Sequence, residues 1–157
     1  MTVARCSGAE ARGSCAEAGG ARVAAAARGW LGTPYRHQAS ARGAGADCLG
    51  LVRGVWRDLL GPEPLEVPPY TRDWGEVGER EVLLDALGAV MLKRSALRAG
   101  RVVVFRMRAR SICKHAGILT APDRFVHAYE RLGVVELHLS NPWRRRIAGI
   151  FAYPQGV

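Results

Sequence analysis

One short stretch, with glycine, aspartate and cysteine together, constrains this chain more than any other part of its sequence. Residues 45–52 read GADCLGLV, and apolar residues then recur at spacings of three and four as far as Leu60. This spacing predicts an amphipathic helix, and Asp47 is a favourable N-cap residue for it. Cys48 would then lie in the first turn, where free backbone N–H groups and the helix dipole favour a thiolate. The stretch predicts either a nucleophilic cysteine or a small apolar residue that anchors the helix.

Length and charge limit what the rest of the chain can be. Its 157 residues suit one domain with a single core, and no apolar run is long enough to span a bilayer. Residues 1–20 are rich in Ala, Gly and Ser and contain no apolar signal segment, so we expect a flexible extension before a domain at 21–157. The formal net charge of +9 favours an anionic partner without choosing among nucleic acid, a membrane surface and a cell-wall polymer.

The order of helical and strand-like patterns predicts an α+β fold. Three helices and an extended proline-rich connector are expected first, the helices at 21–30, 48–61 and 79–94 and the connector at 62–69. Strand-like runs separated by turn residues follow at 102–105, 115–120, 124–128, 134–139 and 147–153. We therefore expect N-terminal helices, one with the cysteine at its start, packed on a mostly antiparallel sheet of about five strands.

Two histidines in the strand-rich half could supply the base that a nucleophilic cysteine needs. His115 opens one strand-like run, and His127 lies within the next one. If these runs are adjacent antiparallel strands that turn near Pro122, the two imidazoles can lie side by side on one face of the sheet. A cysteine at a helix start, a histidine that takes its proton and a third group that orients the histidine suit thiol catalysis. Spacing alone leaves catalytic and structural roles equally open.

A zinc site is the alternative interpretation of the same residues. Cys113 lies two residues before His115, so on an alternating strand both side chains share a face and could join Cys48 and His127 around a metal. However, the four cysteines form no CxxC pair and no zinc-ribbon spacing. We therefore expect no metal and no other cofactor, and reduced thiols rather than a disulfide framework.

Four motifs, in order, resemble the NlpC family of papain-like cell-wall peptidases: GTPY at 32–35, DCLGLV at 47–52, HAGI at 115–118 and RFVHA at 124–128. The matched segments run from about residue 21 to the C-terminus. The resemblance implies the papain-like NlpC-type fold. It also implies that Cys48 is the nucleophile, His115 the general base and His127 the residue that orients His115.

The implied reaction is hydrolysis of the amide between γ-D-glutamyl and the diamino acid in peptidoglycan stem peptides. The Cys48 thiolate would attack the carbonyl, donors near the helix start would hold the oxyanion, and His115 would protonate the leaving amine. In the family a tyrosine at the position of Tyr35 lies over the nucleophile. The residues expected to contact substrate or oxyanion, or to line the cleft, are Tyr35, Asp47, His37 and Trp74.

A longer match, over 32–40 and 49–56, resembles the branch of the family found in tailed phages and gene transfer agents. It implies a protein that joins phage-like tail or baseplate proteins and acts on the wall of the target cell. Because residues 1–20 contain no signal segment, we expect synthesis in the cytoplasm without a signal peptide. Three departures from the family bear on binding rather than on the catalytic residues. They are Leu49 where serine is frequent, Gly100-Arg101 where Gly-Asp is frequent, and a basic segment at 106–114.

Two other functions stay open on the sequence alone. A structural or binding module of a tail hub would keep the fold without activity, and the intact set of Cys48, His115 and His127 argues against it. A nucleic-acid-binding protein would fit the positive charge. The chain lacks the basic motifs with interleaved aromatic residues of the common modules, so we expect no specific nucleic acid and no membrane span.

Overall fold

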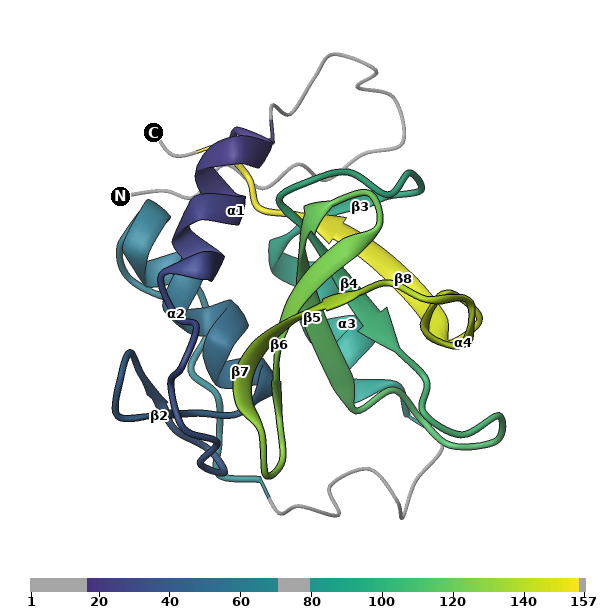
Figure 1. The fold of residues 1–157 in the computed structure, drawn as a ribbon, viewed down its shortest axis with the longest axis horizontal. Coiled ribbons are helices and arrows are strands. Elements are labelled where there is room, and N and C mark those ends of the chain that lie inside the picture. Colours follow the sequence, from purple (N-terminus) through teal and green to yellow (C-terminus); the bar gives the residue numbers. More distant parts are fainter. Residues whose placement is uncertain (1–16, 71–79, 156–157) are drawn as a thin grey trace.

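A six-stranded antiparallel sheet and the helices around it form the computed structural model, which describes residues 17–70 and 80–155 (Figure 1). The strands lie in the order β3-β8-β4-β5-β6-β7. In that order they are Leu92–Arg94, Ile147–Ala152, Arg101–Phe105, His115–Ala121, Arg124–Tyr129 and Gly133–His138. The helices are α1 (Gly20–Arg28), α2 (Cys48–Leu60), α3 (Val82–Val90) and α4 (Asn141–Arg144), and β1 (Ser40–Ala41) pairs with β2 (Gly45–Ala46). The expected α+β fold is confirmed.

The two faces of the sheet carry different cores because successive strand residues point to opposite sides. On one face, side chains of β4, β5 and β6 pack with residues of α1, α2 and α3; these strand residues are Val102, Val104, Ala116, Ile118, Val126 and Ala128. On the other face lies a smaller core of Val103, Phe105, Leu119, Phe125, Leu139 and Ile150, with Trp143 of α4 against it. Figure 1 shows α1 and α2 on one side of the curved sheet and α4 on the other.

The position of α2 is set by close contacts that only glycine permits. A Cβ atom on Gly50 would lie 1.8 Å from the carbonyl oxygen of Ala39, and one on Gly54 would lie 2.0 Å from the Trp30 ring. The Trp30 indole N–H also donates to the Asp58 carboxylate at 2.9 Å. These contacts hold α2 against the preceding loop and against the chain that follows α1.

The helix expected at 79–94 is shorter in the structure, and a strand takes its place at the C-terminal end. Helix α3 ends at Val90, Met91 is extended, and β3 pairs with β8, with Leu92 opposite Ala152. Backbone hydrogen bonds to β8, which is distant in the sequence, outweigh the local helical periodicity. The sheet consequently has six strands rather than about five, and the short β1–β2 hairpin was not expected.

The last residues of the expected flexible extension pack against the domain. The Ala18 N–H donates to the Tyr153 carbonyl at 2.9 Å, and Glu17 pairs with Pro154. The buried Arg101 guanidinium donates to the Glu17 carboxylate at 2.7 Å, and this hydrogen bond lowers the pKa of Glu17. Residues 1–16 lie outside the described residues. Arg101, a departure from the family pattern, therefore attaches the start of the described chain to the sheet.

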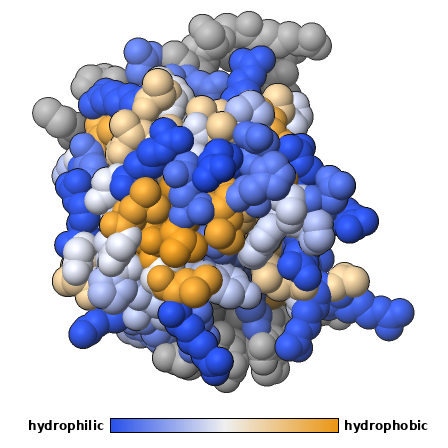
Figure 2. Space-filling view, in the orientation of Figure 1, coloured by the Kyte–Doolittle hydropathy of each residue, from blue (hydrophilic) through white to orange (hydrophobic). Residues whose placement is uncertain are grey.

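Polar and charged side chains cover most of the face seen in Figure 2, with apolar side chains gathered near its centre. No helix among the described residues is both long and apolar enough to cross a bilayer.

Candidate active site

The Asp47 carboxylate organises the backbone around the start of α2. It accepts hydrogen bonds from the Gly50 N–H at 2.8 Å, from the Gln38 N–H at 2.7 Å and from the Tyr70 hydroxyl. The first bond is the N-cap expected from the sequence. Asp47 was also expected to contact substrate or oxyanion. Because its carboxylate is an acceptor held by three donors of the protein itself, it positions the helix and offers no donor to an oxyanion.

Cys48 is the first residue of α2, and its sulfur lies against the strand that His115 begins. The thiol donates to the Lys114 carbonyl at 3.5 Å, and the backbone N–H groups of Ala116, Leu49 and Cys48 itself lower its pKa by hydrogen bonding to the sulfur. Burial, followed by the neighbouring Asp47 carboxylate, outweighs these donors and raises the pKa of Cys48 to about 12. The helix start was expected to favour a thiolate; in the structure the thiol is neutral because desolvation dominates.

The two histidines lie side by side on adjacent strands, as the sequence predicted. Nε2 of His115 and Nδ1 of His127 are 2.7 Å apart, and both side chains are buried. Gly117, between them on the same face, leaves the necessary room: a Cβ atom there would lie 2.8 Å from the Phe125 ring. Burial lowers the pKa of His115 to about 3, with a further contribution from His127, and burial lowers the pKa of His127 to about 4. Both imidazoles are neutral at pH 7.

The sulfur lies against the backbone at the beginning of β5, and the imidazoles face different surroundings from it. The His115 ring stacks on Phe105 at 5.8 Å between centroids, on the sheet face that carries α4, whereas Ala116 faces the helices. Among the described residues, no hydrogen bond joins the Cys48 sulfur to either imidazole. The structure thus places the Cys48 sulfur against the backbone at the start of β5 and pairs the two imidazoles with each other.

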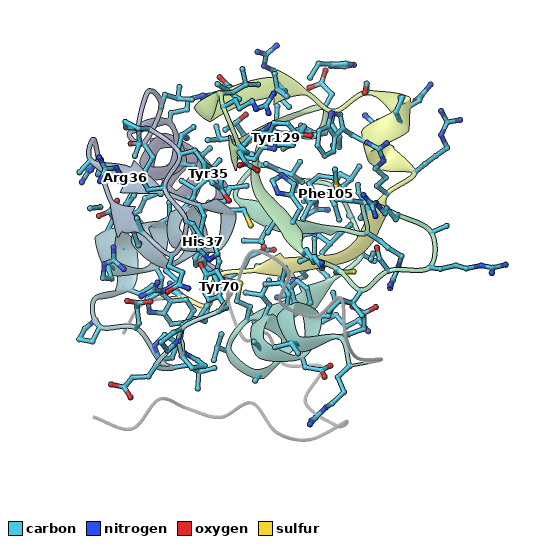
Figure 3. The ribbon with its side chains drawn as sticks, turned by 90° about the horizontal axis from the view of Figure 1, so that it is seen from below. Tyr35, Arg36, His37, Tyr70, Phe105 and Tyr129 are labelled. Carbon is cyan, nitrogen blue, oxygen red and sulfur yellow. The ribbon has the colours of Figure 1, made fainter. Side chains whose placement is uncertain are left out.

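A cavity of about 120 Å³ lies over Cys48. Its lining residues are Tyr35, His37, Asp47, Cys48, Leu49, Tyr70, Lys114 and Glu130. Figure 3 shows Tyr35, His37 and Tyr70 close together, with Phe105 farther across the sheet.

Tyr35 and His37 were expected at this cleft, and each is held in place. Tyr35 pairs with Ala46 through the backbone, and the His37 Nε2 lies 2.8 Å from the Tyr70 carbonyl oxygen. Trp74, also expected there, lies outside the described residues. Neither His115 nor His127 lines this cavity.

Besides Leu49, three lining residues were not assigned to the cleft from the sequence: Tyr70, Lys114 and Glu130. Lys114 directly precedes β5, and Glu130 directly follows β6. Their closeness in sequence to the two histidine motifs was the available signal. Tyr70 directly follows the proline-rich connector, and an aromatic residue beside that connector was the corresponding signal. Lys114 and Glu130 give the cavity one cationic and one anionic side chain.

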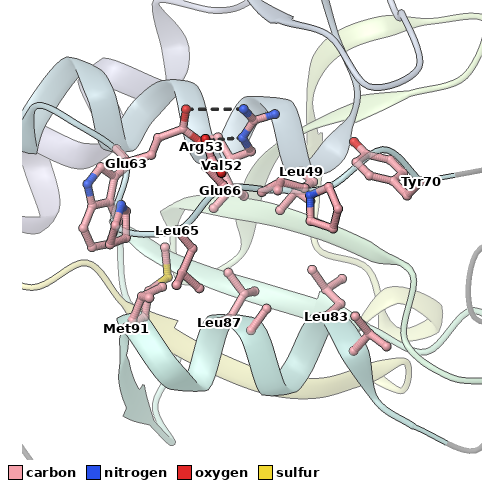
Figure 4. A pocket seen from close by; sticks show the side chains of 17 residues that line it. Leu49, Val52, Arg53, Glu63, Leu65, Glu66, Tyr70, Leu83, Leu87 and Met91 are labelled. Carbon is pink, nitrogen blue, oxygen red and sulfur yellow. Dashed lines mark hydrogen bonds and ion pairs between the residues drawn. The ribbon is translucent and has the colours of Figure 1, made fainter.

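A longer apolar groove of about 180 Å³ adjoins this cavity, between α2, α3 and the connector (Figure 4). Leu49 and Tyr70 line both spaces. The leucine that departs from the family pattern therefore contributes apolar surface to the boundary between the cysteine cavity and the groove.

The position of Cys113 does not fit the zinc alternative. Cys113 is buried in the core on the helical face, and its backbone N–H donates to the Glu81 carboxylate at 2.9 Å. It therefore does not share the histidines' aromatic surroundings, contrary to the strand alternation on which the zinc set depended. Within residues 17–70 and 80–155, no group of three or more His, Cys, Asp or Glu side chains could hold a metal ion.

Known proteins resemble most of this chain in sequence. The family model described as the NlpC/P60 family matches residues 32–151. A curated relative, "Murein DD-endopeptidase MepS/Murein LD-carboxypeptidase" of Escherichia coli strain K12, is 34% identical over 118 residues, covering 74% of this chain and 54% of the relative. "Gamma-DL-glutamyl hydrolase" of Bacillus subtilis is 28% identical over 122 residues, covering 77% of this chain and 26% of the relative. The chain thus spans about half the length of the first relative and about a quarter of the second.

Solved structures share the fold at low sequence identity. The NlpC/p60 domain of peptidoglycan hydrolase SagA superposes with a TM-score of 0.57 at 18% identity, covering 86% of this chain and 99% of that domain. An NlpC/P60 family protein from Bacillus cereus gives a TM-score of 0.59 at 16% identity, covering 90% of this chain and 42% of that protein. These neighbours confirm the expected NlpC-type fold.

Proposed function

We propose that this chain, which belongs to the NlpC/P60 family, is a cysteine peptidase that hydrolyses an amide bond of peptidoglycan stem peptides. One observation carries the proposal: Cys48 begins α2 beside the strand backbone at His115, and the imidazole of His115 is paired with that of His127 at 2.7 Å. The names of two relatives, a murein endopeptidase and a γ-DL-glutamyl hydrolase, support the substrate class.

Acyl transfer to sulfur accounts for the residues around Cys48. The sulfur attacks the substrate carbonyl, its proton passes to His115, and a tetrahedral oxyanion forms. Backbone N–H groups at the start of α2 are the donors available to that oxyanion. Collapse of the intermediate breaks the C–N bond as His115 returns the proton to the leaving amine. Water, deprotonated by His115, then attacks the thioester and releases the carboxylic acid and the thiol.

The resting charges suggest when the proton moves. Burial keeps the thiol neutral and both imidazoles neutral, so a standing thiolate–imidazolium pair is disfavoured before substrate binds. Proton transfer would then accompany attack on the carbonyl. His127 would orient His115 through their shared hydrogen bond, and Tyr35 would position the substrate over the sulfur.

The proposed scissile bond is the amide between γ-D-glutamyl and the diamino acid. Lys114 and Glu130 at the cavity suit a peptide that carries both carboxylate and amine groups. The test is digestion of purified peptidoglycan, with mass analysis of the released fragments. Wild-type protein should release fragments that begin with the diamino acid, and Cys48→Ala should release none.

Cys113→Ala is the matched control, because it removes a buried thiol away from the Cys48 cavity. It should retain cleavage. Equal fragment release by a folded Cys48→Ala protein would refute the mechanism. Failure of folded wild-type protein to release fragments from any peptidoglycan would favour a structural module of the same fold.

We further propose that the chain acts as a component of a phage-like tail, on the wall of a target cell. This proposal rests on the resemblance of residues 32–40 and 49–56 to the phage and gene-transfer-agent branch. Purified particles probed with an antibody to this chain test it. Absence of the chain from particles, with the protein found elsewhere, would remove the tail role and leave the peptidase proposal intact.

A further inference from the structure

One ring nitrogen of the histidine pair is buried without a hydrogen-bond partner. His127 is fully buried, and its Nδ1 is engaged with His115, but its Nε2 has no partner among the described residues. A buried polar nitrogen in this state is uncommon and its surroundings decide whether it carries a proton. The position of that proton determines which nitrogen of His115 can act as a base.

Two proton arrangements fit the 2.7 Å contact between the rings. In the first, His115 donates from Nε2, so His127 carries its own proton on Nε2 and the His115 Nδ1 keeps a lone pair. In the second, His127 donates from Nδ1, so its Nε2 bears a lone pair and His115 is protonated on Nδ1. Only the first arrangement leaves His115 able to accept a proton through the nitrogen not used in the pair.

Aromatic rings surround His127. Phe125, Tyr129 and Trp143 lie 4.6, 5.3 and 5.3 Å from its centroid, and Trp143 meets the imidazole at an interplanar angle of 89°. The faces of aromatic rings are electron-rich and accept N–H groups weakly, whereas they offer nothing to a lone pair. These surroundings therefore favour a proton on Nε2 of His127, which is the first arrangement.

Trp143 and Tyr129 also contact the second histidine, with ring centroids 5.9 and 5.8 Å from that of His115. Of these two residues, Trp143 also packs against Phe105, at 5.0 Å. It belongs to α4, on the side of the sheet away from α1 and α2 (Figure 1), and it is half-buried, between solvent and the histidine pair. The Arg146 guanidinium lies 5.7 Å from its centroid.

We propose that Trp143 is a positioning residue that sets the tautomer of the histidine pair, with the proton on Nε2 of His127 and the lone pair on Nδ1 of His115. This inference rests on the proposed function, because the lone pair matters only if His115 is the base. Trp143 acts through the histidines and has no contact with substrate in this assignment.

Nitrogen-15 NMR of the full chain with labelled histidine tests the proposal, because the shifts report which ring nitrogen is protonated. Wild type should show a protonated Nε2 on His127 and an unprotonated Nδ1 on His115. Trp143→Leu removes the aromatic face; the two tautomers should then both be populated, and kcat should fall about tenfold with KM within about twofold. Trp143→Phe keeps an aromatic face and should restore most of the wild-type tautomer and rate.

Arg146→Ala is the control, because it removes the cation beside Trp143 and leaves the ring in place. It should leave the tautomer unchanged. A protonated Nδ1 on His115 in the wild type would overturn the proposal without any variant, as would a wild-type tautomer in folded Trp143→Leu. The NMR measurement needs no activity, so the expected tautomer in a protein that releases no peptidoglycan fragments would refute the peptidase alone.

Discussion

The cysteine end and the histidine end of the site are built in different ways, yet both favour uncharged groups. Around Cys48 the surroundings are polar, and they come from Asp47, the loop before α2 and Tyr70 directly after the connector. Around His115 and His127 they are aromatic, and they come from strands and from α4. Burial raises the pKa of the thiol and lowers that of both imidazoles.

The different surroundings of the two ends suit two different tasks. The cysteine end fixes the position of the sulfur through a carboxylate and backbone N–H groups, whereas the histidine end excludes water from the proposed base, His115. Charge would then be separated only during attack on the substrate, when both ends must act together. The following variants change one end at a time.

The largest effect is expected at the histidine end. His115→Ala removes the proposed proton acceptor and should lower kcat about a thousandfold. His127→Asn can still hydrogen-bond to His115 and should lower kcat about tenfold, with KM nearly unchanged for both variants. Steady-state kinetics on a defined stem peptide measures this. Equal losses in the two folded variants would contradict separate base and orienting roles.

The next largest effect is expected at the cysteine end and concerns the stability of the fold. Asp47→Ala removes the N-cap and leaves the buried Gly50 N–H and the partly buried Gln38 N–H without their acceptor, which should cost about 3 kcal/mol of unfolding free energy. Urea denaturation measures it. Asp123→Ala, which removes an exposed carboxylate, is the control and should cost less than about 0.5 kcal/mol. A small loss in Asp47→Ala would show that the helix start does not depend on this carboxylate.

The sequence could predict those features of the two ends that depend on neighbouring residues. The start of α2 was predictable because its signals, Asp47 and the apolar spacing after Cys48, are local. The pairing of His115 with His127 was predictable because a single turn joins their strands. These features depend on a few neighbouring residues.

Features that depend on distant chain segments were missed. Strand β3 forms because Leu92 meets Ala152, and no local pattern indicates that partner. The place of Trp143 beside both histidines depends on how α4 folds back over the sheet. The thiol pKa was expected to fall at the helix start, whereas burial by the assembled fold raises it.

A third prediction concerns the pH dependence of stability at the histidine end. Each buried histidine stays neutral when folded but binds a proton when unfolded below its ordinary pKa of 6.5. Acid therefore favours the unfolded state: stability is full above pH 6.5 and falls toward the folded pKa values. Between about pH 7 and about pH 5.5 the loss should be about 1 kcal/mol for each histidine.

Urea denaturation at the two pH values measures this loss, in wild type and in the double variant His115→Ala with His127→Asn. The double variant should lose most of the pH dependence in this window. The ion-paired carboxylates lie outside it, because their lowered pKa values move their contribution below pH 4.5. An unchanged pH dependence in the double variant would show that the two imidazoles are not held neutral.

The smallest effect is expected from one hydroxyl at the cysteine end. Tyr70→Phe removes the donor to Asp47, while the Gly50 and Gln38 N–H groups still hold that carboxylate. We therefore expect a loss of about 1 kcal/mol in stability and a few-fold fall in kcat/KM, because Tyr70 also lines the Cys48 cavity.

Tyr153→Phe is a matched control for Tyr70→Phe: its buried hydroxyl donates to the Val52 carbonyl at 2.9 Å, farther along α2 and outside the cavity. The control should lose similar stability and keep full activity. Equal activity losses in the two variants would mean that Tyr70 acts only by stabilising α2, and the polar surroundings of Cys48 would then have no direct part in placing the substrate.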